Sequence, residues 1–190
     1  MKQFKIASAI ALTLGLAIAG SASAQSSSGG TITFTGSVTD ATCTVTGGTG
    51  TSGGTGNFSV ALDQVDASVL SAAGVTANPK MFDVIIGGPG QGTCEDGKVA
   101  SMSFLPSSIY IDAATGALSN ALSGEATNTE IQLLDSTNAV IDLRMGAVAG
   151  MATIANNTAT IPFTAQYLAV NGAATPGLVS TNVVYAVTYN

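Results

Sequence analysis

The sequence predicts an all-β domain, and three observations support this prediction. Short segments that alternate apolar and polar residues recur along the chain, as in strands with one buried face. Clusters of Gly, Ser, Thr and Asn, which favour turns, separate these segments. Helix signals are few. Together these features are typical of a β-sandwich or a β-barrel.

The first expected strand is residues 31–38 (TITFTGSV). It places Ile32, Phe34, Gly36 and Val38 on one face and hydroxyl side chains on the other. The further expected strands are 58–62, 81–86, 100–105, 108–111, 130–134, 139–143, 160–170 and 182–189. A hairpin turn is expected at residues 135–138 (DSTN), a helical turn at 64–73, and a flexible loop in the low-complexity stretch 47–56.

Residues 1–24 have the features of a secretory signal peptide. Lys2 and Lys5 precede an uncharged apolar run over residues 6–20, and Ala-Ser-Ala at 22–24 supplies the small residues that signal peptidase requires. The run is shorter than the ~20 residues of a membrane-spanning helix. We therefore expect cleavage before Gln25 and export of the remaining chain.

The charge and the cysteine content limit the possible partners. The mature chain keeps three basic residues and all eleven acidic ones, so its surface repels nucleic acid and anionic lipid. Two cysteines, Cys43 and Cys94, remain in an exported chain without histidine, which favours one disulfide over a metal site. Two unrelated buried thiols are the alternative.

The residues required for catalysis are missing. Without His, the Ser-His and Cys-His arrangements and any His-ligated zinc are excluded. The acid pairs Glu95–Asp96 and Asp63–Asp66 lie in turn-rich contexts, where carboxylates are usually solvated. The Gly-Gly-Pro-Gly stretch at 87–90 lacks the Lys-Ser/Thr of a phosphate-binding loop. We expect no enzymatic activity, small-molecule substrate, cofactor or metal.

Several blocks of the sequence resemble the type 1 fimbrial major pilins of chaperone-usher pathways. The blocks occur in that family's order and span nearly all of the mature chain. They are GGTITFTGSV at 29–38 with Cys43 following, FDVII at 82–86 before Cys94, TEIQLLD at 129–135, IPFTAQY at 161–167, GAATPG at 172–177, and residues 183–190. The stretches 87–92 and 47–56 are longer than in that family and are interpreted as loop insertions.

The resemblance implies an incomplete immunoglobulin-like β-sandwich (pilin fold) that lacks its last strand and is completed by donor-strand exchange. The missing strand would leave apolar core exposed in a groove beside an unpaired sheet edge. Residues 25–38 would form the donor-strand arm and residues 39–190 the pilin domain. Ile32, Phe34 and Val38 would enter a neighbour's groove, with Gly36 at a crowded point. Otherwise 31–38 is an ordinary first strand of its own domain.

The resemblance also implies roles for residues in the pilin domain. Cys43 and Cys94 would form the family's disulfide. The C-terminal strand would contribute to chaperone recognition, with Tyr189 as the C-terminal aromatic residue; packing of Tyr189 within its own strand is compatible with that role. The residues concerned are Val183, Tyr185, Val187 and Tyr189.

The implied function is that of a structural subunit of a surface fimbria, which polymerises head to tail and supports adhesion. The expected partners are neighbouring subunits in a homopolymer, a periplasmic chaperone and an outer-membrane usher, with export through the periplasm to the cell surface. A major shaft pilin is favoured. The alternatives are a minor adaptor or tip-associated pilin that binds a host receptor, a tip adhesin with a further domain, and a secreted hydrolase on a β-sandwich.

Overall fold

The computed structural model describes residues 43–190, and this part of the chain contains ten β-strands and no helix. Accordingly, no helix that could cross a membrane is found among these residues. The strands are β1 (Val45–Gly47), β2 (Ser52–Gly53), β3 (Phe58–Ser59), β4 (Thr76–Gly87), β5 (Val99–Leu105), β6 (Leu118–Ser119), β7 (Thr129–Leu134), β8 (Val148–Thr153), β9 (Thr158–Ala169) and β10 (Val184–Tyr189). The all-β prediction is confirmed.

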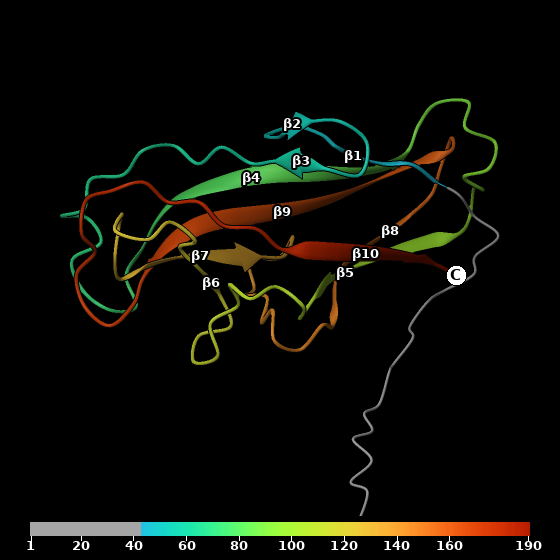
Figure 1. The fold of residues 1–190 in the computed structure, drawn as a ribbon. Coiled ribbons are helices and arrows are strands. Elements are labelled where there is room, and N and C mark those ends of the chain that lie inside the picture. Colours follow the sequence, from blue (N-terminus) through green and yellow to red (C-terminus); the bar gives the residue numbers. More distant parts are fainter. Residues whose placement is uncertain (1–42) are drawn as a thin grey trace, which may run out of the picture. The chain divides into compact units, whose positions relative to one another are not determined.

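The strands form two main antiparallel sheets and one short ribbon (Figure 1). The larger sheet has the order β1-β4-β9-β7-β6, the smaller sheet has the order β10-β5-β8, and β2 pairs with β3. The long strands β4 and β9 lie side by side along the larger sheet (Figure 1). The chain passes from one sheet to the other between β8 and β9, at a turn where Asn156 and Asn157 adopt positive φ.

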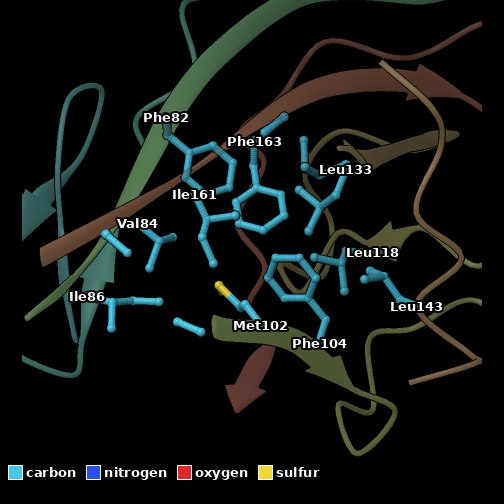
Figure 2. Packing of buried hydrophobic residues seen from close by; sticks show 14 of the residues in the cluster. Phe82, Val84, Ile86, Met102, Phe104, Leu118, Leu133, Leu143, Ile161 and Phe163 are labelled. Atoms are coloured by element: carbon cyan, nitrogen blue, oxygen red, sulfur yellow. The ribbon is translucent and has the colours of Figure 1, made fainter. Parts of the chain in front are cut away.

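The core lies between the inner faces of the two main sheets. Alternate residues of β4 point inward, and Phe82, Val84 and Ile86 are buried. The ring of Phe163 on β9 lies 5.6 Å from that of Phe82 and 5.4 Å, edge to face, from that of Phe104 on β5. Figure 2 shows these rings meeting between the sheets. Aromatic contacts therefore join the two layers at the centre of the core.

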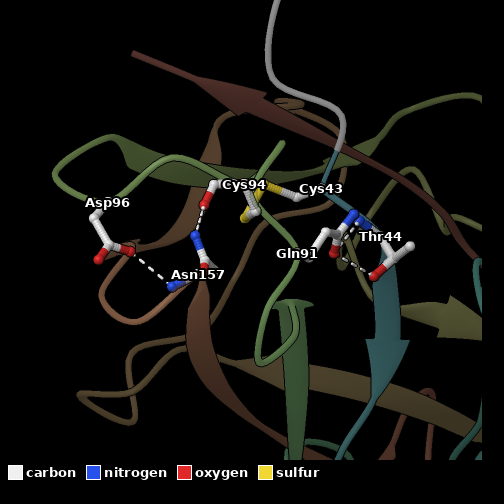
Figure 3. Close-up of a disulfide and its surroundings, with 6 residues drawn as sticks. All are labelled: Cys43, Thr44, Gln91, Cys94, Asp96 and Asn157. Atoms are coloured by element: carbon white, nitrogen blue, oxygen red, sulfur yellow. Dashed lines mark hydrogen bonds between the residues drawn. A yellow bond between two sulfur atoms is a disulfide. The ribbon is translucent and has the colours of Figure 1, made fainter.

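A disulfide joins Cys43 to Cys94, as the cysteine content and the family resemblance predicted (Figure 3). The Cα atoms are 4.7 Å apart, and Cys94 is fully buried. The Asn157 side-chain amide donates a hydrogen bond to the Cys94 carbonyl oxygen (2.8 Å), and Asp96 accepts one from the Asn157 backbone (2.7 Å). The disulfide thus fixes the start of the described chain to the loop between β4 and β5.

Most of the expected strands in the described part are present. The segments expected at 81–86, 100–105, 130–134, 160–170 and 182–189 correspond to β4, β5, β7, β9 and β10. The turn at 135–138 is also present, because the Asp135 carboxylate accepts hydrogen bonds from the backbone N–H groups of Thr137 and Ala139.

Other local predictions were wrong. Residues 108–111 form a turn, because the Ser108 hydroxyl accepts a hydrogen bond from the Tyr110 N–H and only Ile111 makes a bridge. Residues 139–143 make a single bridge, at Val140. Residues 64–73 form successive turns without a helix, and stretch 47–56 contains β2. Strand β8 was not predicted. The expected donor strand 31–38 and the boundaries at 24 and 38 lie outside the described residues.

Candidate strand-binding groove

A hollow of about 620 Å³ lies between two segments that are far apart in the sequence. We call it the groove. Its first wall is residues 56–62, and its second wall is residues 179–183 with Tyr185. The floor consists of apolar core residues, namely Phe82, Met102, Phe104, Leu118, Ile131, Leu133 and Ala165. The volume is roughly four times that of a ~150 Å³ cavity that binds benzene, so the groove has room for several side chains.

The first wall is extended but only partly paired. Phe58, Val60 and Leu62 alternate inward and pack against the core. Beyond β3, the backbone groups of residues 60–62 make no hydrogen bond to any other residue in the range 43–190. Polar backbone groups need a partner, so these groups are available to water or to a strand from outside this range.

The far end of the first wall is held by two side chains of β4. The Asn78 amide donates hydrogen bonds to the carbonyl oxygens of Asp63 (3.3 Å) and Gln64 (2.7 Å). Lys80 forms an ion pair with Asp63 at 3.1 Å. Asn78 lies where the β4–β9 register shifts, with φ at 49°, so its amide leaves the sheet to reach the wall.

The second wall is held mainly by Asn120, which follows β6. Its amide donates to the Leu178 carbonyl oxygen at 2.8 Å, and its side-chain oxygen accepts from the Ser180 N–H at 3.0 Å. The Ser108 hydroxyl also donates to the Asn182 carbonyl oxygen at 2.9 Å. Neither asparagine anchor, Asn78 or Asn120, was predicted from the sequence. No local pattern marks them, since Asn120 lies 58 residues from Leu178 in the chain.

Strand β10, which continues the second wall, has one unpaired edge among the described residues. It pairs only with β5. Asn190 and Val99 exchange two backbone hydrogen bonds (2.9 and 3.1 Å), and hydrogen-bonded pairs alternate along an antiparallel ladder. The backbone N–H and C=O groups of Tyr185, Val187 and Tyr189 therefore point away from β5, where an added strand could pair with them.

The predicted C-terminal strand residues share the inner face of the smaller sheet. Val183, Tyr185, Val187 and Tyr189 are all half-buried and pack against the core. Burial raises the pKa values of the Tyr185 and Tyr189 hydroxyls above the ordinary value for tyrosine. The structure brings these four residues together on one face, and their role in chaperone recognition is a proposal.

The two walls meet at one end of the groove. The Tyr185 hydroxyl donates a hydrogen bond to the Gly56 carbonyl oxygen at 2.6 Å, and its ring lies 5.6 Å from that of Phe58. Tyr167 lines the groove near the opposite end, where burial and then the charge of Asp63 raise the pKa of its hydroxyl. A tyrosine hydroxyl thus lies near each end of the groove.

The floor of the groove is less exposed than the family resemblance implied. Each floor side chain is 6% exposed or less, so the walls cover the core that was expected to be open. The contact between Phe58 and Tyr185 accounts for part of this closure. Side chains from a partner would reach the floor through the hollow between the two walls.

Within residues 43–190, no cluster of catalytic or metal-binding side chains lies at the groove. No group of three potential metal ligands occurs within residues 43–190. Asp66 and Asp96 each bind a backbone N–H, of Ser68 and Asn157 respectively. What the groove offers is apolar side chains and unpaired backbone groups, which suit binding of an extended peptide.

Comparisons with known proteins identify the class to which this chain belongs. The family model described as "Fimbrial protein" matches residues 32–190, and the chain belongs to this family. It is therefore a fimbrial subunit, a structural component of surface pili and not an enzyme. This confirms the predicted family, fold class and absence of enzymatic activity.

Individual relatives agree with this assignment. The chain is 38% identical over 170 residues to the major fimbrial subunit SMF-1 of Stenotrophomonas maltophilia, covering 85% of this chain and 92% of the relative. It is 32% identical over 165 residues to the type-1 fimbrial protein, A chain, of Escherichia coli, covering 85% and 84%. A solved structure of a chaperone-usher pilus has a subunit with the same fold, at a TM-score of 0.54 and 22% identity, covering 86% of this chain and 96% of that one.

Proposed function

We propose that this subunit polymerises head to tail by donor-strand exchange, with residues 31–38 of one copy bound in the groove of the next copy. The observation that carries the proposal is a pair of backbone segments, on either side of an apolar floor, that lack a hydrogen-bond partner within residues 43–190. The edge of β10 lies on one side and residues 60–62 lie on the other. An inserted strand could pair with both.

The expected donor strand has side chains that suit such a groove. Ile32, Phe34 and Val38 alternate on one face, and their full burial contributes at most about 4 to 9 kcal/mol before ordering costs. Gly36 suits a crowded point, because it adds no side chain. Backbone pairing supplies affinity and alternate side chains supply specificity, as in other strand additions.

Donor and acceptor lie at different places on one molecule, so their contact does not close on itself and propagates as a fibre. In this proposal residues 1–24 direct export to the periplasm, residues 25–38 form the arm and residues 39–190 form the pilin domain. A periplasmic chaperone first occupies the groove beside Val183, Tyr185, Val187 and Tyr189. An outer-membrane usher then exchanges the chaperone's strand for the arm of the next copy.

We infer that the chain is the major shaft subunit. The names of two relatives support this inference, since one is a major fimbrial subunit and the other is the A chain of a type-1 fimbria. A minor adaptor or tip-associated pilin would have the same architecture. Quantitative mass spectrometry of sheared surface fibres tests the choice, because a shaft subunit dominates the fibre mass and an adaptor is a trace component.

Deletion of residues 31–38 tests donor-strand exchange. The shortened subunit should still accept a synthetic peptide of residues 25–38 but should not extend a fibre. Gly36→Arg should act in the same way, because a large side chain enters the crowded point, whereas Gly29→Arg, before the strand, should leave fibre length unchanged. Normal polymerisation of the deletion variant would rule out the donor role of this segment.

A further inference from the structure

One hydroxyl in the second wall of the groove has no hydrogen-bond partner. The Oγ1 atom of Thr181 is shielded from solvent, and it neither donates nor accepts a hydrogen bond within residues 43–190. It is the only buried side-chain nitrogen or oxygen atom in this range of which that is true. Thr181 lines the groove. An unpaired polar group therefore lies at the place where a strand is proposed to bind.

The chain on both sides of Thr181 is held in place. On one side, the Ser180 N–H donates a hydrogen bond to the side-chain oxygen of Asn120 at 3.0 Å. On the other side, the carbonyl oxygen of Asn182 accepts a hydrogen bond from the Ser108 hydroxyl at 2.9 Å. The fold thus fixes the position of the Thr181 side chain without using its hydroxyl.

The unpaired hydroxyl lowers the stability of the free subunit. A buried hydroxyl has given up its hydrogen bonds to water, and this loss is not offset when no protein group replaces them. The floor of the groove consists of apolar side chains, which cannot replace them. Valine has nearly the same shape as threonine and would fill the same place without the loss. A buried polar group that the fold leaves unpaired calls for an explanation, and a bound partner supplies one.

The side chains of the expected donor strand that enter the groove cannot pair with this hydroxyl. Ile32, Phe34 and Val38 are apolar, and Gly36 has no side chain. The Thr and Ser side chains that alternate with them in residues 31–37 lie on the opposite face of an extended strand. The main-chain N–H and C=O groups remain. A threonine hydroxyl can donate to a C=O group or accept from an N–H group, so it suits either.

Thr181 also lies where the second wall lacks a regular strand edge. Strand β10 begins at Val184, and its free edge offers main-chain groups at Tyr185 and beyond. Thr181 precedes this edge, and it follows the same two-residue spacing as Val183 and Tyr185, which line the groove with it. Its hydroxyl supplies a hydrogen-bonding group in the part of the wall that β10 does not reach.

We propose that the Thr181 hydroxyl recognises the inserted strand through a hydrogen bond to one of its main-chain N–H or C=O groups. This proposal rests on the proposed function, because donor-strand exchange is what brings a strand into the groove. The apolar floor by itself accepts any apolar group of suitable size. A hydrogen bond to the main chain makes the groove selective for an extended peptide.

Thr181→Val tests this role, because it removes the hydroxyl and keeps the shape of the side chain. The variant is made in the chain without residues 31–38, which keeps both sheets and the whole core and has no donor strand of its own. Fluorescence titration with a labelled peptide of residues 25–38 should show affinity about tenfold below that of the same chain with Thr181. Equal affinity of the two chains would overturn the proposal.

Two substitutions serve as controls in the same titration. Thr181→Ser keeps the hydroxyl and should bind within about threefold of the chain with Thr181. Thr188→Val removes a hydroxyl from β10 at an exposed position outside the groove lining, and it should leave the affinity unchanged. If Thr181→Ser lost as much affinity as Thr181→Val, the methyl group and not the hydroxyl would be responsible, and the proposal would be wrong.

The stability of the free chain distinguishes recognition from a structural role. In urea unfolding without peptide, Thr181→Val should be at least as stable as the chain with Thr181, because it lacks the unpaired hydroxyl. A lower stability would mean that the hydroxyl already has a partner in the free subunit, and would overturn the proposal.

A second peptide identifies the group that the hydroxyl binds. In this peptide, alanine replaces each Thr and Ser of residues 31–37. Thr181→Val should lose the same factor in affinity for it, because the main chain is unchanged. If the loss disappeared, the partner would be a side-chain hydroxyl, and the assignment to the main chain would be wrong.

The titration also tells a failure at Thr181 from a failure of donor-strand exchange. If the chain with Thr181 does not bind the peptide of residues 25–38, donor-strand exchange is wrong, and the role of Thr181 is wrong with it. If that chain binds the peptide and Thr181→Val binds it equally well, only the role of Thr181 is wrong.

Discussion

At Gly150, β8 approaches β9 too closely for any side chain. A methyl group there would lie 2.5 Å from Cγ2 of Ile161 and 3.1 Å from the ring of Phe163. Phe163 is fully buried and contacts both Phe82 and Phe104, so it cannot move aside without disturbing both sheets. The absence of a side chain at position 150 therefore allows the two layers to meet.

We predict that Gly150→Ala lowers the free energy of unfolding by about 1 to 3 kcal/mol, the usual cost of overpacking a core. Urea unfolding of the mature chain measures the change. Gly54→Ala is the matched control, since a methyl group there meets nothing within 4 Å and should change stability by less than ~0.5 kcal/mol. Equal effects of the two substitutions would contradict the packing at Gly150.

Glu130 carries a charge that the fold disfavours. Only 4% of the residue is exposed, and its carboxylate accepts a hydrogen bond from the Thr115 hydroxyl at 2.6 Å. Burial raises the pKa of this carboxyl above its ordinary value of about 4.5, and the charge of Asp112 adds to the rise. Because the folded pKa is the higher one, the stability that this proton confers is present below about pH 4 and is lost as the pH rises through the folded pKa.

We predict that wild type becomes less stable relative to Glu130→Gln between pH 4 and pH 7, because the glutamine stays neutral.

We predict the opposite pH dependence for Asp135→Asn, with wild type becoming more stable relative to the variant as the pH rises. Hydrogen bonds from Thr137 and Ala139 lower the pKa of Asp135, so its stabilising contribution is present at neutral pH and is lost as the pH falls below about 4. Urea unfolding at about pH 2.5, 4, 5.5 and 7 measures both differences, the step below pH 4 reporting Asp135 and the step above it Glu130. If the stability of wild type relative to the variant changed in the same direction with pH for both variants, these assigned environments would be wrong.

At the scale of the elements, strands with an uninterrupted buried face were predictable from the sequence. Buried residues alternate with more exposed ones from Phe82 to Ile86 in β4 and from Ala159 to Phe163 in β9, because the inner residues fill the core between the sheets. β8 was missed because its pairing with β5 shifts between Met102 and Ser103, and this bulge breaks the period of two. Periodicity cannot reveal an irregular register.

The groove was predictable only in part. The alternation of Phe58, Val60 and Leu62 predicted a strand, and the structure keeps that alternation but pairs only β3. A periodic pattern specifies which face is buried, whereas pairing depends on a neighbouring strand. Asn78 and Asn120 hold the walls through contacts that only the folded chain brings together.

We predict that Asn120→Ala weakens binding of a peptide of residues 25–38 about tenfold, or ~1.4 kcal/mol. The substitution leaves the Leu178 carbonyl and the Ser180 N–H without their partner, so the second wall loses its fixed position. Fluorescence titration with the labelled peptide measures the change. Asn171→Ala, at an exposed turn outside the groove lining, is the control, and equal affinity for both variants would contradict the anchoring role.

The disulfide constrains the largest covalent loop in the described residues. Its cysteines are 51 residues apart, and loop closure of this length corresponds to about 4 kcal/mol on the chain-entropy model. We therefore predict that Cys43→Ala/Cys94→Ala lowers the unfolding free energy by about this amount in urea titrations, and that reduction of the wild type by dithiothreitol matches it. A loss below ~1 kcal/mol would mean that the unfolded chain is already constrained in this region.

At the scale of the whole molecule, β10 joins the features on which assembly depends. Its paired edge holds it in the smaller sheet, its inner side chains cover the core, and its free edge continues the second wall of the groove. An exposed edge beside an apolar hollow favours uncontrolled association unless a specific strand covers it. Donor-strand exchange would turn this liability into the contact that builds the fibre.

Hydrogen exchange at single backbone amides of β10 tests this central claim most directly. The amides of Ala186 and Thr188 point toward β5 and should be protected both in the free mature subunit and in the fibre. The amides of Tyr185, Val187 and Tyr189 point to the free edge and should exchange rapidly in the free subunit but become protected in the fibre. If these three amides exchanged equally fast in the subunit and in the fibre, no strand would be added at β10 and the account would be wrong.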